Sequence, residues 1–122
     1  MSKTILAIDD SPSILQMVSH TLTTAGYRVI EAVDGADGYD KAVGNPIDAV
    51  ITDLNMPRLN GLDFIRKYRS HGASAGVPIV FLTTETDDGL KREAREAGAT
   101  GWIAKPFRQD QLLAVVKKVA GA

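Results

Sequence analysis

The sequence predicts an α/β fold in which a parallel sheet of five strands is covered by helices on both faces. Five short apolar runs rich in β-branched residues alternate with five segments whose apolar residues recur at helical spacing. Glycine, proline and asparagine mark most of the junctions between them. Every segment between two strands is long enough for a crossover helix, which a parallel pair of strands requires.

The first strand is predicted over residues 4–8, where the apolar run stops at Asp9 and Asp10. Ser11 and Pro12 are then typical of a helix start, because an acid or a serine can cap the first turn and proline is tolerated within it. The helix that follows ends before a glycine at position 26. Its apolar stripe consists of Ile14, Leu15, Val18, Leu22 and Ala25.

The second strand is predicted over residues 27–32, and Asp34 with Gly35 forms a turn or a helix cap behind it. A helix follows whose apolar stripe is weaker than that of the first. It ends at residues 44–46, which read Gly-Asn-Pro. The stripe consists of Ala36, Tyr39, Ala42 and Val43.

The third strand is predicted over residues 47–52. Asn60 and Gly61 then open a third helix. Residues 70–76, which are rich in glycine, alanine and serine, are predicted to form a loop, and no role is assigned to His71 within it. The apolar contacts of the third helix come from Leu62, Phe64, Ile65 and Tyr68.

The fourth strand is predicted over residues 77–82 and the fifth over residues 100–104. Between them, residues 88–97 are predicted to form a helix with little apolar content, so we expect it to be poorly anchored. Its few apolar residues are Leu90, Ala94 and Ala97. The last helix carries a stripe of Leu112, Leu113, Val116 and Val119.

Right-handed crossovers leave few arrangements of these strands. We expect the flavodoxin-like order 2-1-3-4-5, because the first strand then neighbours the third at the point where the winding direction changes. The prediction is therefore a doubly wound (βα)5 sheet. We expect residues 1–122 to form a single domain with no output domain.

Composition narrows the range of functions. The 122 residues include 14 basic and 15 acidic side chains, which removes the electrostatic footprint of a protein that binds DNA or RNA by itself. The chain has no cysteine and so offers no disulfide or thiol nucleophile. The apolar run near the N-terminus meets two acids too soon for a signal peptide, and no segment approaches a membrane span. We expect a cytoplasmic monomer with no membrane insertion.

A buried strand ends abruptly at Asp53. Taken alone, an aspartate at this place fits a turn cap as well as a functional site. In the predicted strand order, however, the ends of strands one and three bring Asp9 and Asp10 beside Asp53 in one crevice. Thr83 from strand four and Lys105 from strand five lie on the same rim.

Three carboxylates in one crevice require a cation or a proton. Two like charges about 4 Å apart repel by roughly 4 kcal/mol at an effective dielectric constant of roughly 20. The expected ligands are all oxygens, which favours Mg²⁺ over zinc, and Mn²⁺ is also compatible. Since Mg²⁺ is commonly held by carboxylates together with phosphate oxygens, the site also predicts a phosphate.

Phosphoryl transfer to a carboxylate uses these parts. Positioning and charge neutralisation supply most of the catalysis, and an aspartate needs no general base at neutral pH. On this argument Asp53 is the acceptor, and Asp9 and Asp10 hold the metal. Thr83 and Lys105 contact the transferred group.

Several short motifs occur in one order along the chain. They are Ile-Asp-Asp-Ser at residues 8–11, Asp-Leu-Asn-Met-Pro at residues 53–57 with Gly61, Leu82-Thr83, Gly98-Ala99, and Ala-Lys-Pro-Phe at residues 104–107. Each motif alone is weak evidence for a family, but the whole set in this order and spacing is specific. With them the chain resembles the receiver domain of bacterial two-component response regulators, and among these the stand-alone chemotaxis regulators of the CheY type. The resemblance covers essentially the whole chain.

The resemblance implies that Asp53 takes a phosphoryl group from the phosphohistidine of a histidine kinase of the CheA type. It also implies a set of Mg²⁺ ligands. These are Asp10, Asp53 and the backbone carbonyl of Asn55, with Asp9 acting largely through water.

The resemblance further implies a cis peptide bond between Lys105 and Pro106, which would aim the lysine ammonium into the crevice. The switch of the family couples the hydroxyl of Thr83 to an aromatic residue on the fifth strand, here Trp102. Phosphorylation draws Thr83 toward the new charge, and the aromatic ring swings inward. The surface that changes is the face of the fourth helix, fifth strand and fifth helix.

Two residues depart from the pattern of the family. Thr84 stands where alanine or glycine is usual beside the phosphoryl group, and its bulk is expected to slow the approach of the phosphodonor. Trp102 stands where tyrosine or phenylalanine is commoner, and its larger ring is harder to bury. Asn55 and Glu85 resemble the pair found in rapidly dephosphorylating chemotaxis regulators, so we expect a short-lived phosphoaspartate.

The predicted function is a phosphorylation-operated binding module, not an enzyme apart from phosphoryl transfer to Asp53 and hydrolysis from it. Besides the kinase, we expect a flagellar motor switch protein or a phosphatase as partner. One alternative is a phosphate sink with no output partner. Another is a small Mg²⁺-dependent aspartyl phosphatase of the haloacid dehalogenase type, which wants an Asp-x-Asp pair and a cap domain. A nucleotide-binding module is disfavoured, because no glycine-rich loop follows the first strand.

Overall fold

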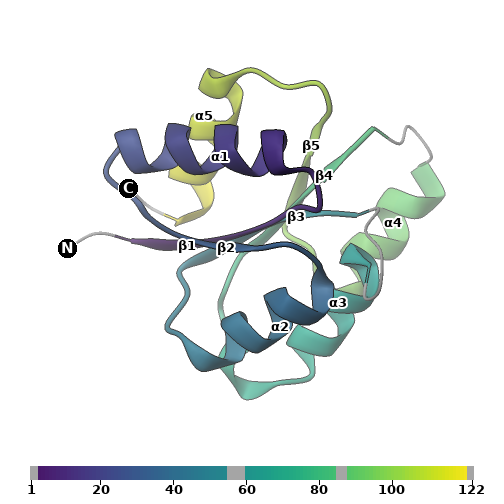
Figure 1. The fold of residues 1–122 in the computed structure, drawn as a ribbon. Coiled ribbons are helices and arrows are strands. Elements are labelled where there is room, and N and C mark those ends of the chain that lie inside the picture. Colours follow the sequence, from purple (N-terminus) through teal and green to yellow (C-terminus); the bar gives the residue numbers. More distant parts are fainter. Residues whose placement is uncertain (1–2, 55–59, 85–87, 121–122) are drawn as a thin grey trace.

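The computed structural model describes residues 3–54, 60–84 and 88–120. Its strands are parallel and form one sheet in the order β2-β1-β3-β4-β5, so the predicted class and strand order are confirmed (Figure 1). The strands are β1 (Thr4–Ile8), β2 (Arg28–Ala32), β3 (Ala49–Asp53), β4 (Ile79–Thr83) and β5 (Gly101–Ala104). The α-helices are α1 (Pro12–Thr24), α2 (Gly35–Gly44), α3 (Gly61–Arg69), α4 (Asp88–Ala97) and α5 (Gln109–Ala120). None of the helices described is long and apolar enough to cross a membrane.

Different helices cover the two faces of the sheet. α1 and α5 lie on one face, and α2, α3 and α4 lie on the other (Figure 1). Residues that alternate along the strands fill both interfaces, as expected for parallel strands that are buried on two sides. The core on the side of α1 and α5 includes Ile5, Ala7, Ile51 and Leu82. The core on the opposite side includes Leu6, Ile8, Val50 and Ile79.

The third and fourth strands are displaced from their predicted limits. β3 begins at Ala49 rather than at residue 47, β4 begins at Ile79 rather than at residue 77, and each ends one residue later than predicted. Pro78 directly precedes β4 and Pro46 lies three residues before β3, and neither has an N–H to donate to a neighbouring strand. Asp53 and Thr83 are the last residues of β3 and β4.

Residues 70–76 are more ordered than their composition predicts. They contain the 3₁₀ helix η1 (Gly72–Ser74), and the side chain of Ser74 is buried. The His71 ring caps this turn, since its Nδ1 accepts a hydrogen bond of 3.0 Å from the backbone N–H of Ala73. His71 lies at the surface, as the sequence predicts, and its ring has this local part in the fold. A local hydrogen bond between side chain and backbone leaves no trace in apolar periodicity.

Candidate functional site

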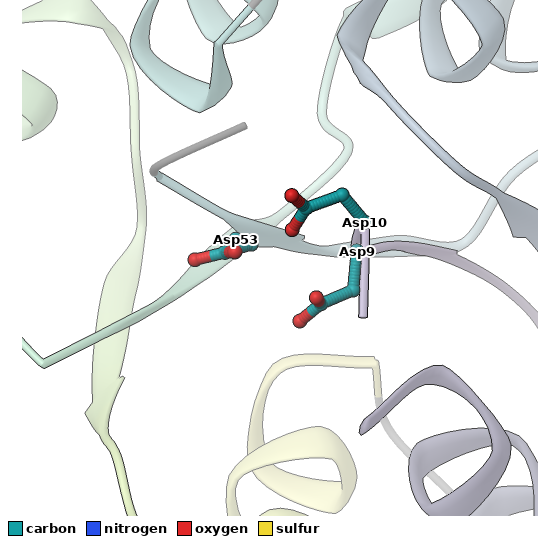
Figure 2. Close-up of side chains that lie close together, drawn as sticks. All are labelled: Asp9, Asp10 and Asp53. Atoms are coloured by element: carbon teal, nitrogen blue, oxygen red, sulfur yellow. The ribbon is translucent and has the colours of Figure 1, made fainter. Parts of the chain in front are cut away.

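Three aspartates meet at the carboxyl ends of two neighbouring strands. Ile8 of β1 is the register partner of Thr52 of β3, so Asp9, which follows β1, and Asp53, the last residue of β3, come to the same edge of the sheet. One carboxylate oxygen from each of Asp9, Asp10 and Asp53 lies within 4.8 Å of the others. Asp9 and Asp53 are buried and Asp10 is exposed. Figure 2 shows the three side chains gathered at this edge.

Lys105 brings a positive charge to the same place. Its Nζ lies 3.3 Å from Oδ2 of Asp9 and 3.4 Å from Oδ1 of Asp53. The peptide bond between Lys105 and Pro106 is cis, as the family resemblance implies. The backbone N–H of Lys105 donates a hydrogen bond of 2.8 Å to the carbonyl of Thr83, which holds the end of β5 against the end of β4.

Both carboxylate oxygens of Asp9 have partners. In Asp9, Oδ1 accepts a hydrogen bond of 2.9 Å from the backbone N–H of Ser11, and Oδ2 faces Lys105. With both oxygens engaged, Asp9 is less available for direct coordination than Asp10, whose side chain is exposed at the rim.

The charges of the cluster do not balance. The three aspartates carry three carboxylates, and Lys105 carries the one ammonium group beside them. Among these four side chains there is thus a formal excess of two negative charges at the mouth of the crevice. Negative charges at this spacing are costly unless a cation joins them. The donors are carboxylate oxygens, with no thiolate or imidazole among them, which suits a hard cation such as Mg²⁺.

Gly61 fixes the backbone beneath the cluster. A Cβ atom on Gly61 would collide with the backbone of Asp53 and Leu54. Without a side chain, α3 begins directly against the end of β3, and the N–H of Gly61 donates a hydrogen bond of 3.0 Å to the carbonyl of Leu54. The sequence predicts Gly61 as a helix start and as part of the family motif that begins at Asp53, but not its contact with the backbone of β3. The close approach depends on how α3 meets the sheet, which local spacing does not show.

Thr83 and Trp102 lie on the same face of the sheet, two register positions apart. Phe81 is the register partner of Trp102, and Thr83 is the partner of Ala104. Thr83 is buried at the rim, whereas Trp102 is 40% exposed. The indole ring stacks on Phe81, with centroids 6.2 Å apart and planes 25° apart. The Trp102 ring thus lies at the surface, against Phe81 and beside α4.

The other residues of the predicted site are placed only in part. Thr84 is exposed directly after β4. Asn55 and Glu85, to which the sequence assigns metal binding and dephosphorylation, lie outside the described residues. The two cations that flank Trp102, Lys91 and Arg95, were not predicted. Their positions four residues apart on one helix face could have suggested a pair, but not what it faces.

An open cavity of about 480 Å³ lies away from the cluster, beside Pro78 and Gly98. Arg69 is its charged lining residue, and the guanidinium donates hydrogen bonds to the carbonyl oxygens of Gly98 at 3.0 Å and Ser74 at 2.7 Å. Burial lowers the pKa of Arg69. Arg69 therefore ties α3 to two turns of the fold, and the cavity contains none of the predicted site residues.

Comparison with known proteins agrees with the fold. Residues 5–117 match the family described as the response regulator receiver domain. The chemotaxis protein CheY1 of Helicobacter pylori is 36% identical over 119 residues, which are 96% of this chain and 96% of that protein. The transcriptional regulatory protein KdpE of Mycobacterium tuberculosis is 38% identical over 90% of this chain. That match covers 47% of KdpE, so the chain spans about half the length of this relative.

Solved structures give the same result. The chemotaxis protein CheY4 of Vibrio cholerae superposes with a TM-score of 0.94 at 44% identity, covering 98% of this chain and 99% of that one. The receiver domain of the Pseudomonas aeruginosa sensor histidine kinase PA1611 superposes with a TM-score of 0.91 at 28% identity over 100% of both chains. Its structure has a magnesium ion coordinated in the active-site cleft. The chain belongs to the response regulator receiver domain family of two-component signalling proteins and is of the CheY type.

Proposed function

We propose that residues 1–122 act as one receiver domain that accepts a phosphoryl group on Asp53 from a histidine kinase and thereby changes the surface it offers to a partner. The observation that carries the proposal is the contact of the Lys105 ammonium with both Asp9 and Asp53, beside Asp10, at the ends of β1 and β3. This arrangement presents a carboxylate nucleophile next to a fixed positive charge. CheY-type receivers are signalling proteins rather than classical enzymes.

The residues present fit a divalent cation. Asp10 and Asp53, with the backbone carbonyl of Asn55, are the groups we propose to hold Mg²⁺ or Mn²⁺, and Asp9 acts through water. When bound, the metal neutralises charge on the phosphoryl oxygens and on the carboxylates around them. The excess of negative charge in the cluster and its all-oxygen donor set support this assignment.

The transfer step needs little from the protein beyond placement and charge. An Oδ of Asp53 attacks phosphorus, an O–P bond forms, the P–N bond of the donor phosphohistidine breaks, and its electron pair stays on the imidazole nitrogen. Lys105, which pairs with Asp53 in the structure, moves its ammonium onto a phosphoryl oxygen. The hydroxyl of Thr83 donates a hydrogen bond to another phosphoryl oxygen. Thr84 stands where the phosphodonor approaches Asp53.

The readout runs through β4 and β5. Once Thr83 turns toward the phosphoryl group, space opens beneath Trp102, and the ring swings inward from its exposed position. We propose that this alters the face formed by α4, β5 and α5. Similarity to CheY1 and CheY4 favours chemotaxis as the pathway, with a kinase of the CheA type as donor and a flagellar motor switch protein or a phosphatase as partner.

The acceptor assignment is tested by labelling with acetyl phosphate and Mg²⁺, followed by intact-mass measurement. The wild type should gain one phosphoryl group, and Asp53→Asn should gain none. Asp40→Asn is the matched control, because Asp40 is an exposed aspartate on α2 far from the cluster. Labelling of Asp53→Asn at the rate of the wild type would overturn the proposal.

A further inference from the structure

A hollow near the starts of the strands is lined by two side chains of opposite charge, Arg28 and Asp48. It has a volume of about 270 Å³ and lies between the start of β2 and the loop that joins α2 to β3. The acid cluster stands at the other edge of the sheet, where β1 and β3 end. The remaining lining residues of the hollow are Thr4, Ile30, Asn45 and Pro46.

The backbone of the sheet holds both charged residues in place. The N–H of Arg28 donates a hydrogen bond of 2.9 Å to the carbonyl of Lys3, and the N–H of Asp48 donates one of 2.8 Å to the carbonyl of Thr4. The carboxylate of Asp48 is fixed as well, because its Oδ2 accepts a hydrogen bond of 2.7 Å from the N–H of Thr4. Asp48 is thus a half-buried acid in a defined position, whereas the side chain of Arg28 is exposed.

The two charges of the hollow do not neutralise each other. Arg28 and Asp48 are both among the described residues, and no ion pair joins them, so their charged atoms are too far apart for direct contact. A guanidinium and a carboxylate that line one hollow without touching leave room for a ligand with a charge of each sign. Ile30 and Pro46 add apolar surface to the same lining.

We propose that this hollow binds a small apolar α-amino acid as its zwitterion. The ligand's ammonium group pairs with Asp48, its carboxylate pairs with Arg28, and its side chain lies against Ile30 and Pro46. Charge-assisted hydrogen bonds of both kinds are stronger than neutral ones. Small-molecule sites commonly combine apolar lining with a few polar groups, and this volume lies just below the range of about 300–1,000 Å³ that suits drug-sized ligands. A single amino acid therefore fits better than a peptide, whose terminal charges are farther apart.

The first experiment titrates the protein with L-valine and follows the amide signals of Arg28, Ile30 and Asp48 by NMR. Two matched probes lack one charge each, since N-acetyl-L-valine has no ammonium group and L-valinamide has no carboxylate. Glycyl-L-valine keeps both charges but places them one residue farther apart. L-Valine should bind at least about tenfold more tightly than any of the three, because each probe loses a charge-assisted hydrogen bond.

The possible results of this titration separate the kinds of ligand. Binding of N-acetyl-L-valine as tight as that of L-valine would indicate a site for anions at Arg28 alone, and equal binding of L-valinamide a site for cations at Asp48 alone. Equal binding of glycyl-L-valine would indicate a peptide site. Each of these results would overturn the proposal, as would unchanged amide signals at every concentration up to the solubility of L-valine.

Two variants test the residues of the hollow. Asp48→Asn removes the negative charge but keeps an oxygen that can accept from the N–H of Thr4, and Arg28→Gln removes the positive charge from an exposed side chain. Each should weaken binding of L-valine by about tenfold or more. Glu96→Gln and Lys118→Gln are the matched controls, because they remove one charge of each sign from exposed positions on α4 and α5 and should change the affinity by less than about twofold. Affinities of the hollow variants equal to those of the controls would overturn the proposal.

The hollow contains none of the groups proposed for phosphoryl transfer, so its test is separate from that of the proposed function. Asp53→Asn should bind L-valine with the affinity of the wild type, and Asp48→Asn should be labelled by acetyl phosphate at the rate of the wild type. A failure of labelling at Asp53 would count against the proposed function alone. Loss of L-valine binding in folded Asp53→Asn would overturn the placement of the amino-acid site at this edge of the sheet.

Discussion

The centre of the sheet at β3, where the acids meet, and its edge at β5, which carries Trp102, are built differently. All five residues of β3 are buried, whereas β5 has one buried residue, Ile103. α3 buries four of its residues, but α4 buries only Ala94, as its poor apolar stripe predicts. The groups that perform chemistry thus stand on a well-packed support. The surface proposed for the readout stands on the least anchored helix, which suits an element that moves.

The difference in anchoring can be measured as stability. Phe64→Ala in α3 should lower the free energy of unfolding by about 3–5 kcal/mol, because its ring is fully buried and stacks on Tyr68. Leu90→Ala in α4 should lower the free energy of unfolding by clearly less, since Leu90 is only partly buried. Urea titrations of both variants give the comparison. Equal losses would mean that the two helices are anchored alike.

Lys105→Ala should slow phosphorylation by acetyl phosphate about 10²-fold or more, because it removes the fixed positive charge beside Asp53. The folded protein should retain binding of Mg²⁺, since the acids are untouched. Lys118→Ala, which removes an exposed lysine of α5, serves as the control. A labelling rate within a factor of about two of the wild type would rule Lys105 out as a contact of the transferred group.

Gly61→Ala should destabilise the protein by about 1–3 kcal/mol and slow labelling of Asp53, because the added methyl group collides with backbone atoms of Asp53 and Leu54. Gly72→Ala is a suitable control, since a Cβ at Gly72 meets nothing within 4 Å. Thermal unfolding and labelling rates report both effects. A variant that folds and labels like the wild type would show that the backbone at the end of β3 is not tightly held.

The smallest effect concerns the contact between Lys91 and Trp102. Lys91→Gln should change the stability by no more than about 1 kcal/mol, as expected for a cation over an exposed aromatic ring. It should nevertheless alter the emission of Trp102, the single tryptophan of the chain. An emission spectrum identical to that of the wild type would show that Lys91 does not rest on the ring in solution.

Much of the fold could be predicted from local pattern. Apolar runs that end in Asp9 and Asp53 imply parallel strands with acids at one edge, and right-handed crossovers then leave few arrangements. The acid cluster followed from this order alone. The strand limits at Ala49 and Ile79 were each missed by two residues, because apolar character continues where the hydrogen-bonded ladder does not.

What the sequence did not reveal depends on contacts between distant elements. The cap of η1 by His71 and the two hydrogen-bonded oxygens of Asp9 are specific placements of single polar atoms. The position of Lys91 over Trp102 requires the packing of α4 against β5. Periodicity reports which residues face the core. It says nothing about which charged side chains meet on the outside.

The central claim is that phosphorylation of Asp53 changes the position of the Trp102 ring. The most direct measurement is the fluorescence of Trp102 as Mg²⁺ and beryllofluoride are added to the wild type and to Asp53→Asn, with loading checked by ¹⁹F NMR. We predict a change in emission in the wild type and none in Asp53→Asn. An unchanged spectrum from fully loaded wild-type protein, or the same change in both proteins, would contradict it.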